Sequence, residues 1–339
     1  MRSIRYPLIA LAFVAFLFGC KDPERSGKEK TMAERLGLGV IPGVGWSARE
    51  VQTIARQAEE AGFDAICAAE VNNDVMATAQ LMGTATTRIT VATWIANVYL
   101  RHPYVCAQGA AFIADATDGR FLLGLGVSHQ PVNRALGIDM PEPQAALRRY
   151  VTAVRRWLKG EGPATHIPQR PAAYPVPVYV AALASPAVEL GGELADGLMP
   201  FLWSAARVTK SKVWAARGRA KAPDLAPLDL TLGLPTFLGN NLDAMRTAAR
   251  QNLELFTTFP FFQRLFRAMG YTDEAALMER GGGQDALTDR LLDAVCLLGP
   301  VTRCREQLEA FRTAGVALPI LMPPMGVEAA RTVIQAFRR

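Results

Sequence analysis

Polar side chains that could do chemistry stand directly after short apolar runs of the sequence. Glu70, Asn97 and the pair Ser128-His129 each occupy such a position. A neutral imidazole can act as a general acid or base, and a carboxylate can do so where burial raises its pKa. We therefore predict that Glu70 and His129 are catalytic and that Asn97 and Ser128 bind a ligand. A loop histidine that is only solvated is the plainer alternative for His129.

The segment Gly124-Leu125-Gly126-Val127-Ser128 combines small residues with a hydroxyl group. It would allow the backbone to approach a bound molecule closely, and we predict ligand contacts at Gly126, Val127 and Ser128. It is not the dinucleotide-binding fingerprint, because the third glycine is absent and the segment lies in the middle of the chain. A turn that ends a strand explains the two glycines nearly as well.

Several function classes are disfavoured by the sequence. His102, His129 and His166 are far apart and form no ligand-spaced pair, so we expect no metal site. No serine stands in a nucleophile elbow, which leaves hydrolase chemistry without support. The formal charge of +6 suggests nucleic acid, but residues 1–31 hold six basic against three acidic residues and the other basic residues are scattered. We expect a small-molecule substrate and no nucleic-acid partner.

The elements that would position these residues alternate between apolar runs and helical segments. Most runs are continuously apolar, which is typical of strands buried on both faces of a parallel sheet. Eight strand–helix units predict a single (β/α)8 barrel, also called a TIM barrel, with its active site at the C-terminal strand ends. A doubly wound sheet is the alternative, but the first run lacks the phosphate-binding glycine pattern of that fold. The predicted strands are residues 36–41, 64–69, 89–95, 120–126, 178–182, 197–201, 228–238 and 317–322.

One stretch of almost eighty residues breaks this rhythm between the seventh and eighth strands. It holds an aromatic segment from Phe256 to Phe266 and helical patterns at 287–298 and 302–314. Insertions at this end of a barrel often cap the active site or form a subunit contact. We expect a helical insertion at about 240–300, within a barrel domain of residues 32–339.

Residues 1–31 are predicted to be a leader outside the barrel. Residues 1–20 have the basic start and apolar run of an export signal, and Leu17-Phe18-Gly19-Cys20 resembles a bacterial lipobox. A lipid anchor at Cys20 would be the only membrane contact and would place the protein at the cell envelope. Translation from Met32 is the alternative, and it would leave the protein in the cytoplasm.

A longer set of motifs resembles a known family. These motifs are Ala61-Gly62-Phe63-Asp64, Val98-Tyr99-Leu100-Arg101-His102-Pro103, the run from Gly119 to His129, and Leu298-Gly299-Pro300. Their order and spacing resemble the luciferase-like oxidoreductases, especially the coenzyme F420-dependent branch with its methylenetetrahydromethanopterin reductase-like proteins. The resemblance covers residues 36–339 and implies a barrel that binds F420, or alternatively FMN. It further implies hydride transfer to or from a small organic substrate, and a homodimer.

The resemblance also adds expectations about individual residues. Relatives carry a bulge after the third strand, often with a non-proline cis peptide, which would fall at Trp94-Ile95 and place one of these side chains behind the cofactor ring. Asn97 would be a polar ligand of the cofactor. Ser185 would cap the helix after the fifth strand and donate to an anion there.

Two departures from the family pattern leave the function open. Many relatives carry an acid followed by a histidine after the second strand, whereas Val71 follows Glu70 here. The paired glycine of many relatives after the fifth strand is replaced by Ala182-Leu183-Ala184. An FMN-dependent monooxygenase and a non-catalytic, surface-anchored binding protein on the same barrel are therefore the alternatives.

Overall fold

The structure is a computed structural model that describes residues 34–162 and 170–339. The expected leader, with Cys20 and Met32, lies outside the described residues, as does His166. Within the two described ranges, no helix is both long enough and apolar enough to cross a bilayer.

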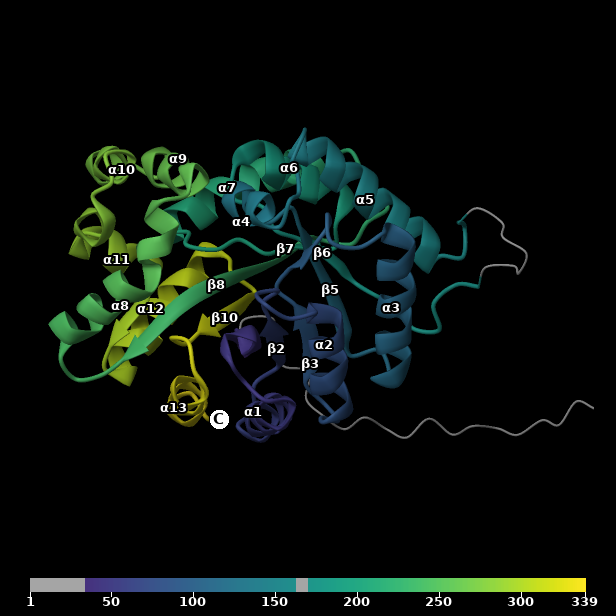
Figure 1. Ribbon diagram of the computed structural model, residues 1–339, viewed down its shortest axis with the longest axis horizontal. Coiled ribbons are helices and arrows are strands. Elements are labelled where there is room, and N and C mark those ends of the chain that lie inside the picture. The colour runs from purple at the N-terminus through teal and green to yellow at the C-terminus, as the bar shows by residue number, and fades with distance from the viewer. Residues whose placement is uncertain (1–33, 163–169) are drawn as a thin grey trace, which may run out of the picture. The chain divides into compact units, whose positions relative to one another are not determined.

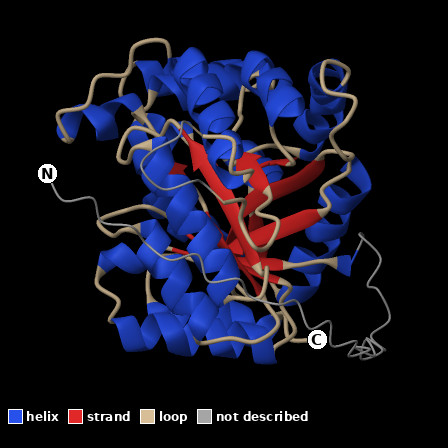
Figure 2. Ribbon diagram, turned by 90° about the vertical axis from the view of Figure 1, so that its right-hand side faces the viewer, coloured by secondary structure: helices blue, strands red, loops and turns tan. Residues whose placement is uncertain are grey.

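Eight parallel strands close into a ring, which confirms the predicted (β/α)8 barrel. β10 pairs with both β8 and β1, and this pairing closes the sheet. Figure 2 shows the strands enclosed by helices. The barrel strands are β1 (Gly37–Val40), β2 (Ala65–Ala68), β3 (Thr90–Thr93), β5 (Phe121–Gly126), β6 (Val178–Val180), β7 (Gly197–Leu198), β8 (Asp229–Leu238) and β10 (Leu318–Met322).

Several outer helices begin at residues whose side chains cap them. Ser47 forms a capping box with Glu50, Asp74 accepts hydrogen bonds from the backbone of the next helix, and His102 Nδ1 accepts the N–H of Tyr104. His102 therefore belongs to a helix start, as the Pro103 that follows it suggests. The helices outside the insertion are α1 (Ala48–Glu60), α2 (Val75–Thr84), α3 (Pro103–Ala116), α4 (Gln130–Ala135), α5 (Pro143–Leu158), α6 (Ser185–Leu194), α7 (Ala205–Arg219) and α13 (Val327–Ala336), with a 3₁₀ turn at Pro42–Val44.

Two predicted elements are wrong in detail. The third strand ends at Thr93, and after a cis peptide between Trp94 and Ile95 the chain rejoins the sheet as β4 (Ala96–Asn97) beside β5. The helix predicted to reach Leu298 stops earlier, because β9 (Leu297–Gly299) pairs with the end of β8. A short apolar run fits a helix or a strand equally well, and here the pairing with β8 decides.

The segment between β8 and β10 is mainly helical. Figure 1 shows these helices on the side of the barrel away from α3 and α5. Arg246 on α8 pairs with Asp289 at the start of α11 and with Asp293 within it, so charge pairs tie the two helices together. The elements are α8 (Leu242–Thr257), α9 (Pro260–Ala268), α10 (Thr272–Glu279), α11 (Asp289–Val295), β9 and α12 (Val301–Ala314), with a 3₁₀ turn at Gly283–Ala286.

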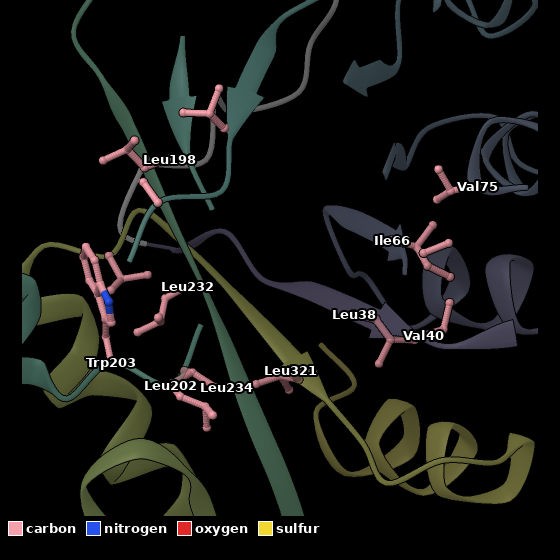
Figure 3. Close-up of a cluster of buried hydrophobic side chains, with 14 of the residues drawn as sticks. Leu38, Val40, Ile66, Val75, Leu198, Leu202, Trp203, Leu232, Leu234 and Leu321 are labelled. Atoms are coloured by element: carbon pink, nitrogen blue, oxygen red, sulfur yellow. The ribbon is translucent and has the colours of Figure 1, made fainter. Parts of the chain in front are cut away.

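Two buried clusters hold the barrel. Figure 3 shows part of the larger one, in which Leu38, Ile66 and Leu321 pack between the strands and the surrounding helices. Each fully buried side chain of this kind stabilises the fold by about 1.5–3 kcal/mol. The smaller cluster is separate from the larger one and includes Ala65, Cys67, Ala92, Trp94, Leu122, Tyr179, Met199, Leu318 and Ile320.

Candidate active site

The ends of β3 and β5 meet in close contact at the C-terminal end of the barrel. The Thr93 hydroxyl donates to the carbonyl oxygen of Gly124 over 2.7 Å and accepts the N–H of Gly124 over 2.8 Å. The expected cis peptide is confirmed at Trp94-Ile95. A Cβ atom on Gly126 would lie 2.9 Å from Ile95 Cδ1, so a side chain there would have to displace Ile95. Glycine at position 126 therefore permits this close approach.

Trp94 and Ile95 lie at different depths. Trp94 is 9% exposed and belongs to the smaller buried cluster together with Met199. Ile95 is half-buried and packs against the edge of that cluster. Ile95 is therefore the better placed of the two to contact a ligand, whereas Trp94 fills the space behind it.

The turn after β5 is held by Asn133, a buried residue that the sequence analysis missed. Its Nδ2 donates to the carbonyl oxygen of Val127 over 2.9 Å, and its Oδ1 accepts from Asn97 Nδ2 over 2.7 Å. Its backbone N–H donates to the carbonyl oxygen of His129 over 3.0 Å. Ser128, between these two carbonyls, has a φ of 58°, in the left-handed region. Asn133 thus fixes the backbone on both sides of Ser128.

His129 faces an aromatic cluster contributed by the segment after β8. Its ring stacks on Phe259 with centroids 4.9 Å apart, and its centroid lies 5.5 Å from that of Phe262. Its side chain does not cap α4, although His129 is the N-cap residue. Burial lowers the pKa of His129, so the neutral imidazole predominates at pH 7. A neutral imidazole at this position can take a proton from a substrate oxygen and return it in the reverse direction.

Glu70 is engaged in a buried ion pair. Its side chain is 6% exposed, and Arg101, 14% exposed, makes two contacts with it. The backbone N–H of Asn97 also donates to Glu70 Oε2 over 2.7 Å. Burial alone would lower the pKa of Arg101, but the hydrogen bond and the charge of Glu70 outweigh it and raise that pKa. With both oxygens engaged, Glu70 is better placed to hold Asn97 than to exchange a proton with substrate.

Ser185 does not cap the helix after β6. Ala184 is the N-cap residue of α6 and Ser185 is its first residue, without a side-chain cap, so the expected capping role is wrong. Ser185 lines a hollow of about 540 Å³ whose other walls include Arg148 on α5 and Trp214 on α7. The expected contact of Ser185 with an anion stays a prediction.

Arg207 on α7 holds the loop that precedes Ser185. It is 6% exposed, lies 4.5 Å from the ring centroid of Trp214, and donates from Nη2 to the carbonyl oxygen of Leu183 over 2.9 Å. Burial lowers the pKa of Arg207, and its Nε has no hydrogen-bond partner among the described atoms. Nothing in the sequence distinguishes Arg207 or Asn133 from other polar residues, since their roles depend on the folds of separate loops.

The structure thus brings most of the predicted site residues into one area. Ile95, Asn97, Gly126, Val127, Ser128 and His129 lie at the ends of β3, β4 and β5, and Glu70 joins them through Asn97. The close backbone approach at Gly126 fits a flat ring, which needs a surface without projecting side chains. At this place Ile95 is a half-buried apolar residue and Ser128 a half-buried residue with a hydroxyl group. His129, directly after Ser128, adds an imidazole, a group able to exchange a proton.

Comparisons with known proteins identify the family and the fold of the chain. A family model described as luciferase-like monooxygenase matches residues 14–318. A putative coenzyme F420-dependent oxidoreductase from Mycobacterium tuberculosis is 26% identical, with 81% of this chain and 92% of that protein covered.

Two solved structures show the same fold at low identity. The coenzyme F420-dependent tetrahydromethanopterin reductase from Methanopyrus kandleri has a TM-score of 0.73 at 17% identity, with 89% of this chain and 97% of that chain covered. The oxygenating constituent of 3,6-diketocamphane monooxygenase from Pseudomonas putida, in complex with FMN, has a TM-score of 0.63 at 15% identity, covering 89% and 96%.

Proposed function

The chain belongs to the luciferase-like monooxygenase family, and on that premise we propose that it transfers a hydride between coenzyme F420 and a small organic substrate. The observation that carries the proposal is the meeting of Ile95, Gly126 and His129 at the ends of β3 and β5. These residues combine a surface that suits a flat ring with the neutral imidazole of His129. The curated relative named as an F420-dependent oxidoreductase supports F420 as the cofactor.

The residues of this chain would divide the work of binding and proton transfer. Ile95 would support one face of the ring, with Trp94 packed behind it, and Gly126, Val127 and Ser128 would lie along the ring edge. Asn97 would bind indirectly, because its amide already donates to Asn133 and its oxygen accepts the N–H of Tyr99. When bound, F420 supplies the centre that accepts or gives up a hydride.

His129 would complete the reaction by handling the proton. In the oxidation of an alcohol, the carbon–hydrogen bond breaks with its electron pair leaving as hydride, and the hydroxyl proton moves to the imidazole of His129. A carbonyl double bond forms in the substrate, with the hydride accepted by the cofactor and the proton by His129. The reverse reaction needs the imidazolium form, and the Glu70–Arg101 pair takes no part in the transfer.

An FMN-dependent monooxygenase is the second candidate, favoured by the family description and by the neighbour that holds FMN. One experiment with the full chain distinguishes the two candidate functions. With reduced F420 and a panel of ketones and aldehydes under argon, we expect reoxidation of F420 that requires the protein. Oxygen consumption with reduced FMN, and no anaerobic reoxidation of F420, would favour the monooxygenase instead.

A further inference from the structure

An aromatic surface borders His129. Phe201, just after β7, lies 5.3 Å from Phe256 between ring centroids, and Phe256 lies 5.1 Å from Phe262. Phe262 in turn contacts His129. Phe201 and Phe256 are half-buried, whereas Phe262 is 1% exposed. The exposed parts of this surface are therefore the rings of Phe201 and Phe256.

The loops that follow the barrel strands carry very little free charge. Residues 41–47, 127–129, 181–185, 199–204, 239–241 and 323–326, which follow six of these strands, contain no charged side chain. Glu70 and Arg101, in the loops after β2 and β4, neutralise each other, and Arg101 also contacts the exposed Asp74 at 3.3 Å. Arg207 points to a backbone carbonyl and to tryptophan rings. In the described parts of the chain, none of these ranges offers an unpaired cation for an anionic substrate; the exposed Arg134 lies beyond them, on α4.

The segments that follow the barrel strands, with α4 included, expose aliphatic side chains to solvent. Six of the eleven large apolar residues exposed in the described chain stand after barrel strands, namely Val44, Val71, Leu100, Val132, Leu136 and Met325. Scattered exposed apolar residues need no explanation, but their concentration around one end of a barrel marks a surface for apolar contact.

We propose that the substrate is an uncharged, apolar alcohol or carbonyl compound whose hydrocarbon part lies against Phe201 and Phe256 and whose oxygen lies at His129. This inference rests on the proposed function and specifies the substrate class. A substrate carboxylate or phosphate would lose its water here without gaining a partner, and unpaired buried charge is strongly unfavourable. The aromatic rings would instead gain from covering an apolar substrate.

Matched compounds that differ by one group test the proposal. 1-Phenylethanol and mandelate share a ring and a secondary hydroxyl, but a methyl group in the first is a carboxylate in the second. The F420 affinity of the full chain is measured first, so that a failure of the proposed function is seen separately. On the F420-loaded protein, we expect 1-phenylethanol to bind and mandelate to bind about a hundredfold more weakly or worse.

Two variants extend the same test. Phe256→Lys places a cation at the aromatic surface and should reduce or reverse the preference for 1-phenylethanol over mandelate. Leu255→Lys, at a 59% exposed neighbour on α8, should leave that preference unchanged. Equal or tighter binding of mandelate by the unchanged protein overturns the proposal. Failure of both compounds to bind at millimolar concentration, with F420 bound, also overturns it. Failure of F420 itself to bind contradicts the proposed function.

Discussion

At the scale of single residues, the proposed proton transfer depends on His129. It sits at the end of β5, stacks on Phe259, and has a pKa lowered by burial. The place of His129 after an apolar run was enough to predict it as a candidate catalytic residue. The sequence could not predict the aromatic surroundings, because these come from α8 and α9, about 130 residues further along the chain.

His129→Gln should reduce turnover by about 10²–10⁴-fold, since the variant cannot accept a proton. F420 affinity should change little, because glutamine keeps the polarity and approximate size of the side chain. In the unchanged protein, alcohol oxidation should fall as the pH drops through the pKa of His129, which lies below the ordinary histidine value of about 6.5. Steady-state pH profiles of kcat/KM measure this, and an acid limb that persists in His129→Gln would contradict the assignment.

Asn133 is expected to act on His129 through the backbone. Asn133→Ala removes the bonds to Val127 and Asn97 and leaves buried groups unpaired, which should cost about 1–3 kcal/mol in unfolding free energy. Turnover should fall further than F420 affinity, because the direction of His129 changes. Asn240→Ala, at an exposed residue, is the matched control. An unchanged pH profile and an unchanged kcat in a folded Asn133→Ala protein would show that Asn133 does not position His129.

At the scale of elements, the site depends on how strand ends and loops meet. The loops after β2 and β4 are joined by the Glu70–Arg101 pair, and the ends of β3 and β5 by Thr93, Gly124 and Gly126. The sequence predicted the cis peptide through the family resemblance, but it could not reveal the partner of Glu70. That pairing exists only because β2 lies beside β3, and Arg101 follows the continuation of β3 in β4.

Glu70→Gln tests whether this residue is structural or catalytic. Removing Glu70 leaves Arg101 with only the exposed Asp74 at 3.3 Å as a counter-charge, so the expected cost in chemical unfolding is at or below the value of about 3–5 kcal/mol that is typical of a broken buried pair. The double variant Glu70→Gln with Arg101→Gln should recover part of that stability and keep measurable turnover. Complete loss of turnover in a double variant that folds and binds F420 would instead support acid–base catalysis by Glu70.

Gly126→Ala tests the close approach of the strand ends. The added methyl group would lie 2.9 Å from Ile95 Cδ1, so Ile95 must move, and F420 affinity should fall about tenfold or more. Gly109→Ala on α3 is the control, because its Cβ would meet only Met76 Cε at 3.5 Å. The control should raise stability by about 0.5–1 kcal/mol without changing F420 affinity. Equal F420 affinity in both variants would show that the ring does not lie at Gly126.

At the scale of the whole molecule, the sequence predicted the barrel well because each strand–helix unit carries a local signal. Continuous apolar runs and capping residues such as Ser47 mark the units, and eight of them leave few alternatives. The short strand β9 escaped prediction because its apolar residues fit a helix equally well. Asn133 and Arg207 escaped because a polar residue acquires its role only when distant loops converge.

The central claim is that the ends of β3 and β5 bind the ring of F420, and a binding titration tests it most directly. The full chain is titrated with F420 and, separately, with FMN, and the cofactor fluorescence is followed to saturation. We expect saturable binding of F420 that is tighter than binding of FMN. Tighter binding of FMN, or binding of neither by a folded sample, would contradict it.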